Sequence, residues 1–381
     1  MCSKEKKTVV HITTVHHPLD PRIYYKQCQS LQRAGYDVTL LAPDAEKVIP
    51  SSIVNIKSIN RRNNRLLRIG ISTLEAYWKA RKLKADIYQI HDPELLPVAW
   101  LLKKKSNVVI YDIHEDYETA MMEREYLPKS VRRFCAKAYR LVERLFSRKL
   151  ELCLAEKYYR EKYPNGKCIL NYPLVNEKLV HHNRTDKPIE DKLLYTGNVR
   201  VDRGAFQHAK LPLVDENISV HLIGQCPGNL AEQMEHLAGE AKDRLHMEGV
   251  DRYIPKTDID ESYVKHRWLA GVALFPPSDH FKKKELTKFF EYMSAGIPIL
   301  CSDFPAWKAF VEKHRCGMAV NPEDEQEIKA AIDYLRNNEQ EALKMGENGR
   351  RAVLETLNWE VEEQKLVEWY DTLWRKNEKT S

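Results

Sequence analysis

Short clusters of histidine, acidic and arginine side chains follow three apolar runs in the first half of the chain. The side chains concerned are His16, Asp20, Arg22, His91, Asp92, His114 and Glu115. Imidazoles and carboxylates can move protons or hydrogen-bond a hydroxylated substrate. If each apolar run is a strand of one parallel sheet, the clusters meet at the same sheet edge, and we expect them to line one ligand site.

The same mixture of side chains could bind a metal ion, so the metal alternative has to be weighed. His-Glu-x-x-His or a similar ligand spacing does not occur, and arginine accompanies the carboxylates. We therefore expect no metal and no other cofactor.

In the second half of the chain, a glycine-bearing turn comes directly after an apolar run. It spans residues 197–204 and contains Gly197, Arg200 and Arg203. Backbone N–H groups at such a turn, followed by the start of a helix, favour an anion, and two guanidinium groups add full charges. The alternative is an ordinary tight turn.

The stretch that most specifically indicates a ligand site covers residues 282–298. Thr287 and Lys288 are predicted to open a helix that carries Glu291 one turn later and ends at Gly296. A lysine at a helix start suits a diphosphate, and a carboxylate further in suits the two hydroxyls of a ribose. The alternative is a charged, solvated helix start.

Apolar runs alternate with helical stretches along the whole chain, which predicts an α/β fold with parallel sheets. A polar segment at residues 181–192 interrupts the pattern, which then restarts. We expect two Rossmann-like domains, residues 1–185 and 186–357, facing across a ligand cleft. Residues 358–381 are expected to form a final helix that packs back toward the first domain.

Length and composition fit a globular protein of two domains. The 381 residues are 43% hydrophobic and 30% charged, and no apolar run approaches the roughly 20 residues of a membrane span. The eight cysteines show no Cys-x-x-Cys pair, so we expect reduced thiols. With no apolar signal region at the start of the sequence, we expect a cytoplasmic protein.

The net charge of +6 is concentrated in basic clusters, of which the helical stretch 130–149 is the most pronounced. Its apolar residues recur near a helical period: Val131, Phe134, Ala138, Leu141, Leu145 and Phe146. One interpretation is a surface helix whose apolar stripe packs on its own domain. The other is an interfacial helix in peripheral contact with the anionic inner face of a membrane. No nucleic-acid-binding signature is present, so nucleic acid is not an expected partner.

Several segments together resemble the family-4 retaining glycosyltransferases of the GT-B fold over nearly the whole chain. The segments are 11–26, 91–97, 111–117, 195–197, 288–298 and 358–360. Within this family the chain is most similar to enzymes that assemble bacterial surface polysaccharides and exopolysaccharides. The resemblance implies a metal-independent transfer of sugar from a nucleotide-diphosphate sugar to a glycan or lipid-linked acceptor.

The resemblance also implies roles for individual residues. Glu291 would hold the ribose, Arg203 and Lys288 would face the donor diphosphate, and His114 would lie beside the donor sugar. Gly197 would let the backbone approach the phosphates. The residues implied on the donor or acceptor side of the cleft are His16, Asp20, Arg22, His91, Asp92 and Glu115.

Three positions depart from the family pattern. Lys283 stands where many relatives have a first glutamate, eight positions before Glu291. Asn198 replaces an arginine, which leaves Arg200 as its substitute, and the loop at His16 lacks the usual glycine pair. These departures keep two alternatives open, a GT-B nucleotide-sugar epimerase and a non-catalytic partner subunit.

Overall fold

The computed structural model describes residues 7–45, 53–122, 128–182 and 188–378, and the chain forms two compact units. Unit 1 comprises Met1–Asn171 and Trp359–Ser381, and unit 2 comprises Tyr172–Asn358. The boundary expected at residue 185 lies outside the described residues. The chain passes into unit 2 earlier, where the ring of Tyr172 packs against Phe290 at a centroid distance of 5.1 Å.

Unit 1 is built on a parallel sheet of seven strands in the order β3-β2-β1-β4-β5-β6-β7. The strands are β1 (Thr8–Ile12), β2 (Asp37–Pro43), β3 (Asn55–Ile59), β4 (Ile87–Ile90), β5 (Val108–Ile113), β6 (Glu151–Leu154) and β7 (Lys167–Cys168). The edge strands β3 and β7 were not expected, because neither has a strong apolar run. The central strand β1 lies between β2 and β4, with His11 aligned to Leu40 on one side and Gln89 on the other.

The helical segments of unit 1 lie between these strands. They are η1 (Pro21–Cys28), α1 (Gln29–Arg33), α2 (Arg65–Leu67), η3 (Arg68–Ser72), α3 (Thr73–Leu83), η4 (Pro93–Leu95), α4 (Leu96–Leu102), α5 (Tyr117–Met122), α6 (Lys129–Ser147), η5 (Lys157–Glu161) and α15 (Trp359–Glu378). Segment η1 begins where it does because Asp20 accepts from the backbone N–H groups of Arg22 and Ile23, with Pro21 at the first helical position.

Both faces of the unit 1 sheet are buried, as expected for parallel strands. Val10 and Tyr111 point to a core that includes Ala76 and Ala99 of α3 and α4. Val9 belongs to the opposite core, together with Ile110 and residues of η1, α1 and α15. The pleat sends successive side chains to opposite faces, so each strand supplies both cores.

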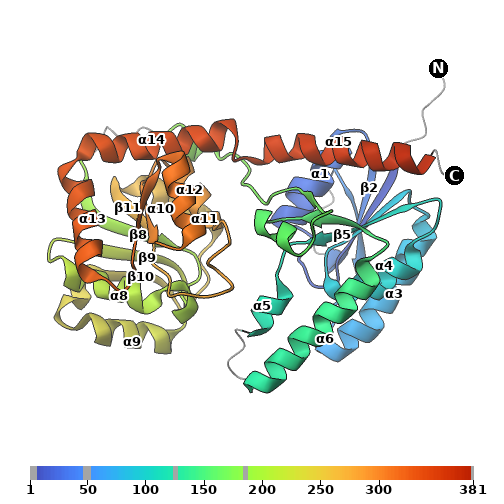
Figure 1. Ribbon diagram of the computed structural model, residues 1–381, viewed down its shortest axis with the longest axis horizontal. Helices are drawn as coiled ribbons and strands as arrows, with labels where there is room; N and C mark the ends of the chain where they lie inside the picture. Colours follow the sequence, from blue (N-terminus) through green and yellow to red (C-terminus); the bar gives the residue numbers. More distant parts are fainter. Residues whose placement is uncertain (1–6, 46–52, 123–127, 183–187, 379–381) are drawn as a thin grey trace. The chain divides into compact units, whose positions relative to one another are not determined.

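The last helix, α15, covers one side of unit 1 beside α1 and β2 (Figure 1). Trp359 Nε1 donates to Ser30 Oγ at 2.9 Å, and Glu362 accepts from the backbone N–H of Leu170 at 2.8 Å. At the other end, Lys7 pairs with Asp371 at 2.8 Å. These contacts make the C-terminal helix part of the unit formed by the N-terminal half of the chain.

Unit 2 contains a parallel sheet of six strands in the order β10-β9-β8-β11-β12-β13. The strands are β8 (Glu190–Thr196), β9 (Ser219–Cys226), β10 (Leu245–Val250), β11 (Trp268–Ala273), β12 (Ile299–Ser302) and β13 (Gly317–Val320). The helical segments are α7 (Glu177–Val180), η6 (Val201–Arg203), α8 (Ala205–Val214), α9 (Gly228–Ala238), η7 (Gly239–Arg244), α10 (Lys256–Lys265), α11 (Thr287–Ser294), α12 (Pro305–His314), α13 (Glu325–Asn337) and α14 (Glu339–Glu355).

Helix α11 has the boundaries that the sequence predicts. It starts at Thr287, and Gly296 ends it with a φ of 68°, which a glycine adopts without strain. The backbone N–H of Ile297 then donates to the carbonyl of Tyr292 at 2.8 Å, which closes the helix end.

Seven cysteines lie in the described part of the chain, and all seven are free thiols; the eighth, Cys2, lies outside it. Among the described helices, none has the length and apolar character that crossing a bilayer requires.

Candidate active site

The buried end of β5 holds an arginine–aspartate pair. Arg22 Nε and Nη2 donate to Asp112 Oδ2 and Oδ1 at 3.0 and 2.7 Å, and both side chains are buried. Gln27 Nε2 donates to the same carboxylate at 3.0 Å, and Arg22 also donates to the carbonyl of Ile169. Arg22 was expected to line the cleft; the structure instead places it beneath the site as the counter-ion of Asp112.

The charges of this pair stabilise each other. Burial alone would raise the pKa of Asp112, but the Arg22 charge, hydrogen bonds from His91 and Arg22 and the nearby His114 imidazole hold it well below its usual value. Burial alone would lower the pKa of Arg22, and the Asp112 carboxylate raises it instead. Asp112 is therefore ionised, and it fixes the groups around it.

Four histidines form a connected row around Asp112. His91 Nδ1 lies 3.1 Å from Asp112 Oδ2, and His91 Nε2 lies 2.9 Å from His11 Nδ1. A carboxylate only accepts, so His91 carries its proton on Nδ1 and accepts at Nε2 from His11. Burial and neighbouring imidazoles lower the pKa of His11 and burial lowers that of His91, which favours these neutral forms. On the other side, His114 Nδ1 lies 3.6 Å from Asp112 Oδ2.

His16 completes the row at the outer side of the site. Its Nε2 lies 3.1 Å from His114 Nε2 and 3.4 Å from Asp92 Oδ1, and its Nδ1 lies 3.3 Å from Asp20 Oδ2. Asp92 is buried at the end of β4 and also accepts from Thr13 and Thr14. The structure thus brings His16, Asp20, Asp92 and His114 together, as the strand-end pattern predicts.

We expect protonation of His16 to stabilise the folded protein, so that stability depends on pH. Burial would lower its pKa, but the Asp20 hydrogen bond and the Asp92 and Glu115 charges raise it. The folded state therefore holds this proton more tightly than the unfolded chain does. This stabilisation is complete below the unfolded pKa of about 6.5 and is lost as pH rises through the higher folded pKa.

Thermal unfolding between pH 5.5 and 8.5 measures this effect. The melting temperature of the wild type should exceed that of His16→Gln most at pH 5.5, with the difference shrinking toward pH 8.5. His17→Gln, a change at the next and more exposed loop position, is the matched control. A constant difference for His16→Gln would contradict the assignment.

His91, Asp112 and His114 have ligand atoms within 4.8 Å of one another, a spacing compatible with a metal ion. The Asp112 oxygens, however, already accept from Arg22, Gln27 and His91. A metal ion would have to replace the guanidinium group, so the arrangement favours a hydrogen-bonded network.

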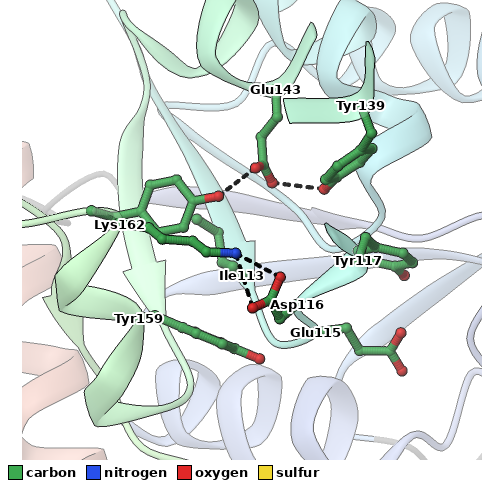
Figure 2. A pocket seen from close by; sticks show the side chains of 9 residues that line it. Ile113, Glu115, Asp116, Tyr117, Tyr139, Glu143, Tyr159 and Lys162 are labelled. Carbon is green, nitrogen blue, oxygen red and sulfur yellow. Dashed lines mark hydrogen bonds and ion pairs between the residues drawn. The ribbon is translucent and has the colours of Figure 1, made fainter. Parts of the chain in front are cut away.

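Beyond His114, the chain forms a small polar pocket (Figure 2). Lys162 Nζ binds both oxygens of Asp116 at 2.8 and 2.9 Å, which anchors the loop to η5. Glu115 is exposed, and Figure 2 shows its carboxylate apart from that pair. Glu115 therefore stays at the surface of the loop, where its charge is one of those that raise the pKa of His16.

In unit 2, three neighbouring strands have a glycine at or near their carboxyl ends, which we call the glycine row: Gly197 after β8, Gly224 in β9 and Gly249 in β10. A Cβ on Gly224 would lie 2.1 Å from the Gly197 carbonyl oxygen, and one on Gly249 would lie 2.4 Å from the Gly224 oxygen. The backbone of the neighbouring strand thus excludes a side chain at Gly224 and at Gly249, whereas the position of a Cβ on Gly197 is unobstructed. The sequence analysis did not single out Gly224 or Gly249, although an apolar run precedes Gly224 as it does Gly197.

A surface pocket of about 140 Å³ lies along the glycine row, lined by Gly197, Asn198, Gly224, Gln225, Tyr253, Ile254, Lys256 and Ile259. Glu291 adjoins it through Lys256, whose Nζ lies 3.1 Å from Glu291 Oε1. Tyr263 OH donates to the other oxygen of Glu291 at 2.8 Å. Glu291 is thus held in one orientation next to a pocket that the sequence did not reveal.

Lys288 is the most unusual cation of unit 2. It is buried, and its ammonium group has no hydrogen-bond partner within the described part of the chain. It lies 3.5 Å above the Tyr195 ring centroid. Burial and the Arg203 charge lower the pKa of Lys288 well below its usual value, only partly opposed by Glu291. A buried cation beside a second cation is costly, and a bound anion would relieve that cost.

The two arginines of the β8 turn differ. Arg203 is half-buried, its guanidinium group 5.7 Å from the Phe281 ring centroid, and its Nε has no partner among the described residues. Arg200 is exposed and pairs with Asp202 at 3.0 Å. Arg203 therefore belongs to the cationic site with Lys288, whereas Arg200, expected there as well, points to solvent. Lys283 is also exposed.

Comparisons with known proteins agree with this architecture. Residues 21–156 match Glycosyltransferase Family 4, and residues 205–352 match Glycosyl transferases group 1. No curated protein matches the sequence at a significant level.

Solved structures share the fold at low sequence identity. Sucrose-phosphate synthase from Thermosynechococcus elongatus gives a TM-score of 0.73 at 18% identity, over 97% of this chain and 100% of that chain. HepE from Anabaena in complex with UDP-glucose gives 0.68 at 11%, over 96% and 100%. WaaG, a glycosyltransferase involved in lipopolysaccharide biosynthesis, gives 0.67 at 12%, over 94% and 98%.

Two Rossmann-like units with parallel sheets define the class as GT-B, as the sequence predicted. The chain belongs to the family-4-type glycosyltransferases of this fold. The expected family and fold are thereby confirmed.

Proposed function

We propose that this glycosyltransferase transfers a sugar from a nucleotide-diphosphate sugar, with retention at the anomeric carbon and without a bound metal. The observation that carries the proposal is the buried ammonium group of Lys288, which lies near Arg203 and has no hydrogen-bond partner among the residues that the structure describes. Two protein cations can neutralise the charge that develops on a departing diphosphate, which is otherwise the task of a metal ion. HepE, a structural neighbour, binds UDP-glucose, which supports a donor of this class.

The pocket beside the glycine row supports the placement of the nucleotide. A base in this pocket would lie next to exposed Tyr253, and Glu291 would accept hydrogen bonds from the ribose hydroxyls. The diphosphate would then lie along the backbone toward Lys288 and Arg203. Helix α11 carries both Lys288 and Glu291, so one rigid element sets the distance between the two contacts.

In the proposed reaction, the bond between the anomeric carbon and the diphosphate oxygen breaks. The acceptor oxygen bonds to the anomeric carbon on the same face, and its proton passes to the departing diphosphate. His114 would hydrogen-bond the sugar, its ring held by Asp112 and His16. The acceptor is proposed to be a lipid-linked or polysaccharide precursor, with the protein bound peripherally at the cytoplasmic face of a membrane.

A thermal-shift panel tests the donor site. UDP, GDP, dTDP and ADP sugars are each added to the protein in EDTA and again in magnesium. A ligand that binds only the folded state raises the melting temperature. We expect a shift from one nucleotide family that EDTA does not reduce. A shift only with magnesium would overturn the metal-free mechanism, and no shift at all would favour a non-catalytic subunit.

Glu291→Ala is expected to remove the ribose contact. Loss of hydrogen bonds to a charged acceptor costs roughly 1.5–3 kcal/mol, so the nucleotide should bind about 10- to 100-fold more weakly. Glu312→Ala, an exposed acidic position on α12, is the matched control. Isothermal titration with the nucleotide found in the panel measures the change. Equal affinity in wild type and Glu291→Ala would remove Glu291 from the site.

A further inference from the structure

Helix α6 exposes the apolar stripe that a surface helix normally buries. Phe134 is 73% exposed and Leu141 is 69% exposed, and Val131 and Leu145 are exposed with them. These positions recur at helical spacing and so form one strip along the outside of the helix. The interpretation in which this stripe packs on its own domain is therefore wrong.

The inner face of α6 is polar instead. Glu143 is buried there and accepts from Tyr111 OH at 3.1 Å and from Tyr163 OH. It also accepts from Tyr139 OH at 2.7 Å (Figure 2). Glu143 is the only acidic residue between Lys129 and Ser147. The helix thus turns its one carboxylate inward, where hydroxyl groups satisfy it.

The outer surface of α6 is consequently cationic as well as apolar. Exposed basic side chains form a second strip beside the apolar one: Arg133, Lys137, Arg140, Arg144 and Arg148. Their spacing of three or four residues places them together along the helix. Apolar and basic strips side by side are the pattern of a helix that lies in a lipid interface.

Two other segments extend this surface. Helix α4 packs against both α3 and α6, and Figure 1 shows these three helices on the same part of unit 1. Trp100 of α4 is 49% exposed, its ring 6.4 Å from Phe146 of α6. From residues 66–78, Leu66 is 80% exposed and Trp78 is 52% exposed. We call the exposed side chains of residues 66–78, 100–105 and 131–148 the docking face.

We propose that the docking face binds the surface of an anionic phospholipid bilayer. Exposed apolar side chains grouped on neighbouring helices mark an interaction site, and the charge of the side chains beside them selects the partner. Residues 95–110 contain no carboxylate, and the one carboxylate of residues 60–84, Glu75, is already paired with Arg62 and Lys79. A partner with negative charge and an apolar layer beneath it complements this face, and tryptophan suits the boundary between the two.

The inference extends the proposed function and rests on it in one respect, that a lipid-linked acceptor is reached at the same membrane. Vesicle binding and nucleotide binding are separate measurements, so either proposal can fail alone. Loss of the nucleotide thermal shift would leave vesicle binding intact, and loss of vesicle binding would leave the thermal shift intact.

Co-sedimentation of the full chain with vesicles tests the docking face. Vesicles of phosphatidylcholine alone are compared with vesicles containing 30% phosphatidylglycerol, at low and high salt. We expect binding to the anionic vesicles that falls at high salt, and little binding to the neutral ones. Equal binding to both compositions, or no binding to either, would overturn the proposal.

Two sets of variants locate the contact. The triple variant Arg133→Gln, Lys137→Gln, Arg144→Gln should weaken binding to anionic vesicles roughly 100-fold, since each basic side chain near such a surface contributes about fivefold to the affinity. The double variant Phe134→Ser, Leu141→Ser should reduce binding at both salt concentrations. Leu213→Ser and Leu354→Ser, at exposed apolar positions of unit 2, are the controls.

All the substituted side chains are exposed, so melting temperatures should change little. Wild-type vesicle binding by both α6 variants would contradict the assignment of the face. Gel filtration provides a further check: an oligomer of the wild type that the Phe134→Ser, Leu141→Ser variant dissociates would identify the face as a protein interface instead.

Discussion

Replacing Lys288 with methionine is expected to stabilise the ligand-free protein and to abolish its response to the donor nucleotide. The ammonium group is buried without a hydrogen-bond partner in the described structure and lies close to Arg203. Removing an unsatisfied buried polar group of this kind recovers roughly 1–3 kcal/mol, and methionine fills similar space over the Tyr195 ring. Melting temperature without ligand should therefore rise.

The same substitution should remove the charge that we assign to the donor diphosphate. Loss of one electrostatic contact to a transition state costs about 100- to 1,000-fold in rate, so sugar transfer or donor hydrolysis should fall by that factor. Lys308→Met, at an exposed position of α12, is the matched control. A Lys288→Met protein that keeps its nucleotide thermal shift and turnover would show that this cation serves the fold alone.

The pH dependence of stability gives an independent test of Lys288. Its folded pKa lies below its unfolded value of about 10.4, so the unfolded chain holds the proton more tightly. Wild-type stability should thus rise with pH between the folded and unfolded pKa, relative to Lys288→Met. Bound nucleotide should weaken this trend, because an anion beside the ammonium group raises the pKa of Lys288 toward its unfolded value.

Asp112→Asn is expected to cause the largest loss of stability in unit 1. The change removes the charge that faces Arg22 and leaves a buried guanidinium group uncompensated. Breaking a buried ion pair in this way costs about 3–5 kcal/mol. Chemical denaturation of the wild type and the variant measures the loss. Glu363→Gln, which breaks the partly exposed pair with Arg33, should cost less than about 1 kcal/mol.

The double variant Arg22→Met, Asp112→Leu measures how strongly the two charges are coupled. With both charges removed, no uncompensated ion remains, so the double variant should lose less stability than the two single variants together. Strict additivity would contradict direct coupling. Because the pKa of Asp112 is held low, its contribution to stability is present above its unfolded pKa of about 3.9 and is lost as pH falls through the folded value.

The Arg22–Asp112 pair affects the site by positioning the histidines around it. Asp112 orients His91 and approaches His114, and His114 contacts His16. Asp112 and Arg22 are therefore positioning residues beneath the site. This role could not be predicted from the sequence, because Arg22 precedes Asp112 by 90 positions and either side chain could equally have faced a ligand.

The sequence by itself determined the local elements and their order. Helix α11 runs from Thr287 to Ser294 and ends at Gly296 as expected, because helix starts, apolar periodicity and a left-handed glycine are short-range properties. The alternation of strands and helices likewise required two parallel sheets. It also placed His16, Asp92 and His114 at one edge of the first sheet, since parallel strands all end there.

Only the tertiary structure decided which face of each helix is buried and which strands lie side by side. The helical period of α6 shows that its apolar residues share a face, but only packing shows that this face is outside and that Glu143 is inside. The close approach of Gly197, Gly224 and Gly249 depends on the pairing of β8, β9 and β10. Whether a side chain is buried depends on the residues that pack around it, and many of these residues are distant from it in the sequence.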